Sequence, residues 1–123
     1  KEDATRRMAG IDKFVVPTGA IEADPVRVRA VYVLNPEPTE QIALEPLGPV
    51  EVFNALTRFT HRERICKAQG LSSEHFALAA QIARSVWAKS VRRPVEGFRI
   101  GELADAVEAD FLALAEVKEA RTA

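Results

Sequence analysis

The chain has 123 residues, 47% of them apolar, so it can bury one core and is too short for two domains of ordinary size. Its 17 lysines and arginines nearly balance its 18 aspartates and glutamates, which argues against a global charge that would attract nucleic acid or an anionic membrane surface. The only cysteine, Cys66, excludes an intrachain disulfide and favours a reducing compartment.

The start of the sequence and its apolar runs indicate the compartment in which the protein is expected. No apolar run approaches the ~20 residues that a membrane span requires, and the mixed charges of residues 1–7 do not resemble a signal peptide. We therefore expect a cytoplasmic protein without a membrane partner. Because the chain begins with Lys1 and not with methionine, we also expect further residues upstream, with residues 1–10 as a flexible lead.

Residues 11–46 are predicted to be mainly strands. A short apolar stretch over residues 13–16 ends at Pro17, which indicates a brief strand. Residues 26–34 alternate as a strand does, with Arg27 and Arg29 at a basic entry and apolar residues on both faces toward the end. Two prolines predict a turn over residues 35–40, after which residues 41–44 are expected to pair antiparallel with the preceding strand.

Residues 47–123 are predicted to be mainly helical, with one strand near residues 86–91. Gly48 and Pro49 favour a helix start, and Ser72 or Ser73 can cap a helix with an alanine face that packs closely on a neighbour. From about residue 100 to 120 an apolar stripe recurs at helical spacing, with acids early and bases late. The predicted fold class is α/β, a mixed sheet with covering helices, in a single domain or in a fragment of a larger one.

Residues with catalytic or metal-binding side chains form no recognised pattern. His61, Cys66 and His75 match no zinc-ligand spacing and no nucleophilic signature, so we expect surface histidines and a small apolar cysteine. The acids of the last helix flank its apolar stripe, which favours a solvated face over an acid-base pair: Glu102, Asp105, Glu108 and Asp110. The six glycines are scattered, so no phosphate-binding loop is expected in this chain.

Basic residues gather in two stretches, around residues 58–67 and 84–93. Together with two helices they are compatible with a helix-turn-helix, so nucleic-acid binding is kept as a weaker hypothesis. The connection between those helices is too long for that motif. A solvated or interdomain basic face is the simpler interpretation.

Three segments, in the same order along the chain, resemble parts of the carboxy-terminal half of the HPr kinase/phosphorylase-like serine kinases. They are residues 12–17 (DKFVVP), 25–34 (PVRVRAVYVL) and 47–56 (LGPVEVFNAL), followed by a helix around Phe76 and a strand ending in residues 91–94 (VRRP). The resemblance covers about residues 11–110 and is carried by packing patterns more than by chemical motifs.

The resemblance implies a fold like part of the phosphoenolpyruvate carboxykinase-like P-loop kinases. In such a protein a Walker A loop binds ATP, nearby acids hold Mg²⁺ and a serine hydroxyl of a protein or peptide is phosphorylated, chemistry that rests on positioning and electrostatic stabilisation. In the family these parts precede the segment seen here. The resemblance therefore implies ATP and Mg²⁺ for the intact protein, none for this chain alone, and an upstream P-loop segment as a partner.

Arg27 looks similar to an arginine of the family's loop near the active site, with Arg29 on the same strand face and Lys13 as a weaker candidate. An arginine fork suits phosphate because it donates two parallel hydrogen bonds. An exposed strand edge protected by charge is the slightly favoured interpretation of these residues. The family commonly assembles into homo-oligomers, and a non-enzymatic regulatory or interaction module of the same fold is the alternative function.

Overall fold

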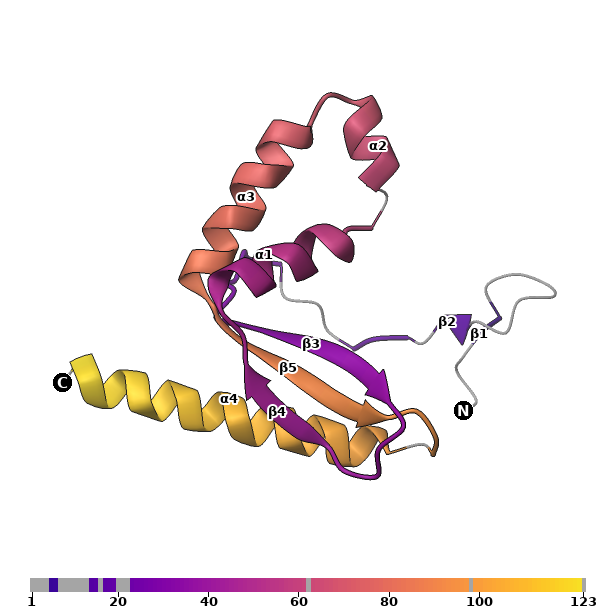
Figure 1. The fold of residues 1–123 in the computed structure, drawn as a ribbon, viewed down its shortest axis with the longest axis vertical. Helices are drawn as coiled ribbons and strands as arrows, with labels where there is room; N and C mark the ends of the chain where they lie inside the picture. Colours follow the sequence, from indigo (N-terminus) through magenta and orange to yellow (C-terminus); the bar gives the residue numbers. More distant parts are fainter. Residues whose placement is uncertain are drawn as a thin grey trace.

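The computed structural model describes residues 5–6, 14–15, 17–19, 23–61, 63–97 and 99–122. Two short strands, β1 (Thr5–Arg6) and β2 (Phe14–Val15), pair antiparallel. The predicted α/β class, with a mixed sheet and covering helices, is confirmed (Figure 1). The remaining elements are β3 (Ala30–Glu37), β4 (Ala43–Pro46), α1 (Pro49–Arg58), α2 (Glu63–Ala68), α3 (Ser72–Ser85), β5 (Trp87–Pro94) and α4 (Ile100–Thr122).

The main sheet has the strand order β3-β5-β4. β5 pairs parallel with β3 and antiparallel with β4, so the prediction that residues 41–44 pair with the preceding strand is wrong. The residues between Glu37 and Ala43 can span the roughly 10 Å between alternate strands, which leaves the middle position to β5. Val91, near the centre of β5, is fully buried there.

The backbone of β3 alternates between facing β5 and facing outward. The carbonyl oxygens of Arg29 and Glu37 accept hydrogen bonds from the N–H groups of Trp87 and Val95, so the odd-numbered residues of β3 face β5. Pro36 consequently lies at an outward position, where its missing N–H costs no ladder bond. The turn predicted for residues 35–40 is therefore wrong for residues 35–37, which continue the strand, and the strand begins at Ala30 and not at Val26.

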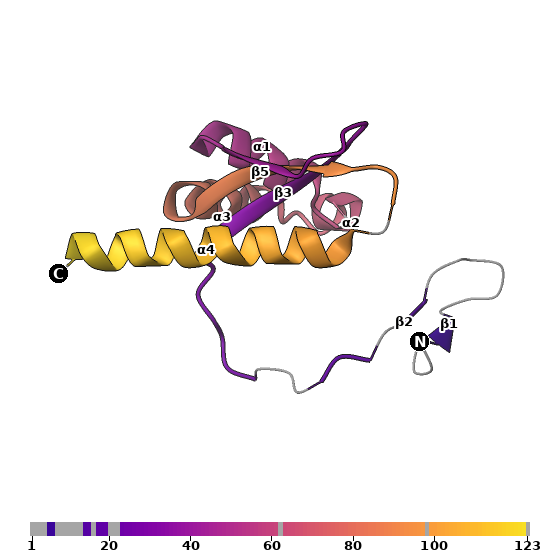
Figure 2. The ribbon, with the colours of Figure 1, turned by 90° about the horizontal axis from the view of Figure 1, so that it is seen from below.

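Helices cover both faces of this sheet, because α4 lies on one side and α1 on the other (Figure 2). Tyr32 points to the α4 side, where its hydroxyl bonds Asp110, while Val31 and Val33 line a hollow together with residues of α1. None of the helices in the described ranges combines the length and the hydrophobicity that a membrane-spanning segment requires.

The start of α1 follows the prediction. Pro49 occupies the first turn, and the N–H of Gly48 donates to the Glu51 carboxylate at 2.8 Å, which closes a capping arrangement. Val52 is then almost completely buried.

α3 packs on α1 through the face that the sequence predicted to be small. Ala79 and Ala83 are buried, and the rings of Phe53 and Phe76 meet edge to face with centroids 4.9 Å apart. The predicted serine cap is wrong, because Leu71 is the N-cap residue and no side chain caps the helix. Gly70, with φ of 70°, turns the chain directly from α2 into α3 and places both serines inside the first turn.

Candidate functional site

The two arginines suggested by the resemblance lie two positions apart in sequence at the entry to β3, just before the strand begins. Arg27 and Arg29 are exposed, as are their neighbours Val26 and Val28, whose exposed fractions are 77% and 55%. The backbone of Arg29 is fixed because its carbonyl accepts the Trp87 N–H at 3.0 Å. Lys13, the third candidate, lies outside the described residues.

A hollow of about 540 Å³ opens between this entry and the inner side of α4. Arg27 and Arg29 border it on the strand side, with Val107, Glu108 and Phe111 among the residues on the helix side. Strand and helix thus bring two guanidinium groups, one carboxylate and an apolar floor to one place. Such a hollow can hold an apolar side chain next to an acid.

A second hollow of about 460 Å³ shares Arg29 and Phe111 with the first. Its lining includes Trp87, and the ammonium of Lys118 lies 5.6 Å from the centre of the indole ring, within the range of a cation–π interaction. Arg29 therefore stands between two neighbouring hollows on the α4 side of the sheet.

Beneath these hollows, one carboxylate joins three elements. Tyr32 of β3 donates a 2.8 Å hydrogen bond to Asp110 of α4, and Lys89 of β5 forms an ion pair with the same carboxylate. Burial, followed by the hydrogen bond to Asp110 and its charge, raises the pKa of Tyr32 well above its ordinary value. Tyr32 is therefore a hydrogen-bond donor near neutral pH and not a base.

The sequence did not reveal this cluster. Asp110 was predicted to lie on a solvated face and Lys89 on a solvated or interdomain basic face, yet their side chains keep only 16% and 22% of their exposure. The solvated-face prediction is therefore wrong for Asp110. Tyr32 and Asp110 are 78 residues apart, so only the register of β3 and β5, which places Tyr32 opposite Lys89, brings the three groups together.

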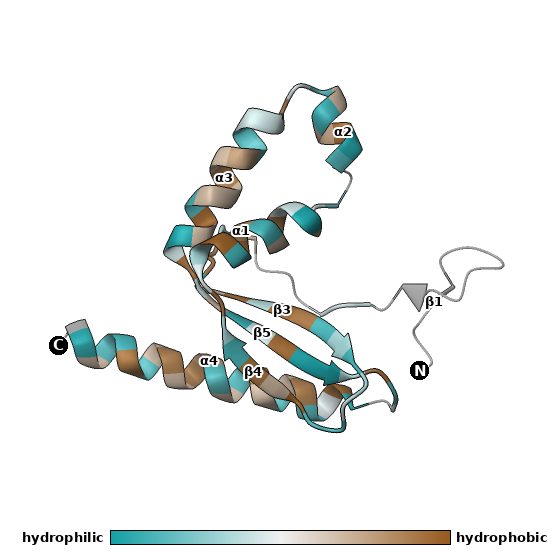
Figure 3. Cartoon of the chain, in the orientation of Figure 1, coloured by the Kyte–Doolittle hydropathy of each residue, from teal (hydrophilic) through white to brown (hydrophobic). Residues whose placement is uncertain are grey.

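On the opposite face of β3, a hollow of about 380 Å³ lies against α1. Its lining is mainly apolar and includes Val31, Val33, Leu56 and Phe59. Phe59 keeps 60% of its exposure there. Figure 3 likewise shows apolar residues recurring on the sheet strands and along α4.

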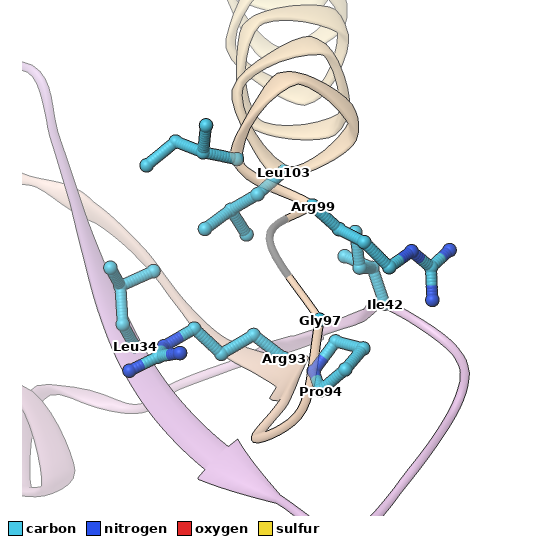
Figure 4. A pocket seen from close by; sticks show the side chains of 8 residues that line it. Leu34, Ile42, Arg93, Pro94, Gly97, Arg99 and Leu103 are labelled. Atoms are coloured by element: carbon cyan, nitrogen blue, oxygen red, sulfur yellow. The ribbon is translucent and has the colours of Figure 1, made fainter.

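A smaller hollow, about 310 Å³, lies where β3 and β5 end and α4 begins. Figure 4 shows Arg93 reaching toward Leu34, whereas the guanidinium of Arg99 points away from both Leu34 and Leu103. Arg99 is engaged, because it donates to the Glu40 carbonyl and pairs with Glu102. The hydrogen bond to Glu102 raises the pKa of Arg99 and lowers that of the Glu102 carboxyl group. The hydrogen bond to the Glu40 carbonyl joins the loop after β3 to the start of α4.

The residues weighed for metal chemistry do not form a site. Among the described residues, no group of three or more histidines, cysteines, aspartates and glutamates could hold a metal ion. His75 is half-buried and its Nε2 lies 2.8 Å from the Thr60 hydroxyl, so the prediction of a surface histidine is wrong at this position. Cys66 is half-buried in α2.

Several side chains of the two basic stretches form ion pairs with acidic side chains. Arg92 pairs with Glu37 and Glu45, and Lys67 pairs with Glu63. Each such pair reduces the positive potential that a phosphate backbone would meet.

The chain was compared with protein-family models, curated proteins and solved structures, and nothing in any of the three matches it.

Proposed function

We propose that this chain is the carboxy-terminal part of an HPr-kinase-like, ATP-dependent protein serine kinase. In this proposal the chain supplies three strands, their covering helices and the two arginines before β3, Arg27 and Arg29. The preceding half of the same protein supplies the Walker loop and the Mg²⁺ ligands. The intact protein that contains both halves is called the parent below. The phosphoacceptor is a serine of a protein or peptide.

One observation carries the proposal. β3 and β5 are parallel, are joined through helices and are covered on both faces, yet in the described part of the chain β3 is an edge strand. Parallel strands covered on both faces belong almost exclusively to α/β sheets, which usually have more than three strands. The exposed apolar residues beside this edge, including Val26 and Phe59, fit a sheet that continues.

The arginines fit a role next to transferred phosphate. Both side chains are exposed at the entry to a parallel strand, where they can reach a ligand held by another part of the sheet. Guanidinium groups stabilise the negative charge of a phosphoryl group during its transfer through paired hydrogen bonds. The chain itself is then a contributor of charge and scaffold and has no complete nucleotide site.

The test is ATP turnover by the parent protein in the presence of Mg²⁺. We expect Arg27→Ala or Arg29→Ala to lower turnover roughly 10- to 100-fold, the range expected when a charge-assisted hydrogen bond is lost. Arg84→Ala, at an exposed arginine of α3, is the matched control and should leave turnover unchanged. A parent reading frame without a Walker loop, or arginine variants with full turnover, would refute the proposal.

A non-enzymatic regulatory or interaction module is the second candidate. It is favoured by the apolar hollow against α1, which suits side chains of a protein segment better than a nucleotide. In that case the parent would bind a protein partner through this surface and show no ATP turnover.

A further inference from the structure

The outer edge of β3 offers its backbone in a pattern suited to one more strand. Because the odd-numbered residues face β5, the N–H and C=O groups of Ala30, Tyr32 and Leu34 point away from the sheet. Pro36, the next outward residue, has no N–H and ends the row of donors. An added strand can therefore form a ladder over Ala30 to Leu34 and stops near Pro36.

The two hollows described above flank this edge on opposite faces of the sheet. One lies against α1 beside Val31 and Val33, and the other lies against α4 beside Arg27 and Ala30. Successive side chains of a strand point to opposite faces, so a strand added here would send alternate side chains into the two hollows. The edge thus provides both the hydrogen-bonding groups and the space for a docked strand.

The linings of the hollows define the chemistry of that strand. The α1 side, with Leu56 and Phe59, fits aliphatic or β-branched side chains. The α4 side has an apolar floor at Val107 and Phe111 and two exposed guanidinium groups, and its one acid there is Glu108. An apolar side chain followed by an acid, placed near the beginning of β3, is complementary to this side.

A second copy of this chain is a poorer occupant. A two-fold antiparallel pairing of β3 with itself would bring the acids at the end of the strand to the arginines at its beginning. Glu37 is already paired with Arg92 at 3.6 Å, so this pairing would exchange one ion pair for another. A strand that carries an acid not already paired therefore fits this edge better than a second copy of β3.

We propose that the outer edge of β3 docks one strand of the parent's phosphate-binding half, with alternating apolar residues and an acid facing Arg27 and Arg29. This inference rests on the proposed function for the source of the strand. It adds which residues form the strand pairing between the two halves, called the seam below: the outward positions from Ala30 to Leu34, ending near Pro36.

Residue-level amide hydrogen exchange tests the seam in the intact parent and in residues 1–123 alone. The isolated chain should protect Val31, Val33 and Asn35, which face β5, and exchange Ala30, Tyr32 and Leu34 rapidly. The parent should protect all six. Rapid exchange at the three even positions in the parent would overturn the inference, and so would protection in the isolated chain that grows with its concentration, because that result indicates self-pairing.

Two pairs of variants in the parent sharpen the test. Leu34→Pro removes one outward donor and should lower protection at Ala30 and Tyr32, whereas Leu34→Ala keeps the donor and should not. The double change Arg27→Glu and Arg29→Glu should lower protection about tenfold through charge reversal, with Arg84→Glu as control. Unchanged protection in the charge variant would contradict the acidic strand even if the proline variant fails to fold.

ATP turnover of the same parent samples separates this inference from the proposed function. Protection of the edge without turnover would support the seam and refute the kinase. Turnover without protection would support the kinase and overturn the seam.

Discussion

The hydroxyl of Tyr32 donates a 2.8 Å hydrogen bond to the carboxylate of Asp110, which ties β3 to α4. Lys89 of β5 completes the cluster from the neighbouring strand. This contact fixes the helix that forms one wall of the arginine hollow, so the position of the candidate site depends on it.

Replacing Tyr32 with phenylalanine tests that dependence. Tyr32→Phe removes the donor but leaves Asp110 paired with Lys89, so we expect the free energy of unfolding to fall by about 1 kcal/mol. Urea unfolding followed by the fluorescence of Trp87, the only tryptophan, measures this change. A variant as stable as the original chain would show that the bond contributes nothing to holding α4.

The titration of Tyr32 gives a second prediction, because it is the only tyrosine. Its pKa is raised above 10.0 in the folded chain, so the folded state keeps the proton that the unfolded state releases. The stabilisation is fully present below pH 10 and is lost as the pH rises beyond it. The near-ultraviolet absorbance of tyrosinate should therefore appear only above the range of a free tyrosine, and ionisation at or below pH 10 in the folded chain would contradict this.

Two glycines should respond in opposite directions to alanine. Gly70 has φ of 70°, in the left-handed region, so Gly70→Ala should destabilise the chain by about 1 kcal/mol. Gly101 is the second residue of α4 and has open space around its Cβ position, so Gly101→Ala should stabilise the chain by less than the roughly 1 kcal/mol expected in a helix interior. Thermal unfolding of the two variants checks both signs, and equal shifts would refute the assigned backbone conformations.

Few side chains of the described residues are fully buried, so truncating one of them should lower the free energy of unfolding clearly. Val91 is fully buried between both neighbouring strands, and Val91→Ala should cost about 2 kcal/mol through lost contacts and a cavity. Val50, 73% exposed in α1, is the matched control and should change stability by less than about 0.5 kcal/mol when replaced by alanine. Chemical unfolding that ranks the two variants in the reverse order would contradict the placement of the core at β5.

Local signals predicted the helices better than the sheet. Gly48 with Pro49 marked the start of α1, because capping depends only on residues within one turn. The pairing of β3 with β5 joins residues such as Ala30 and Trp87 that lie far apart in sequence, and no local pattern encodes it. Pro36 misled the prediction for a related reason, since whether a proline breaks a strand depends on which side of it is paired.

The candidate site was predictable only in part. Arg27 and Arg29 came from the resemblance, and both lie at an accessible strand entry. The hollows beside them need α1 and α4 in place, and the burial of Asp110 needs Tyr32 and Lys89 at matching positions of two strands. Such features arise from packing between distant segments, which spacing along the chain does not reveal.

The most direct test of the central claim is calorimetric titration of ATP with Mg²⁺ into residues 1–123 and into the parent protein. The claim that this chain contributes strands and arginines to a nucleotide site completed by the preceding half predicts saturable binding by the parent and none by residues 1–123. Saturable, magnesium-dependent binding by residues 1–123 alone would contradict it.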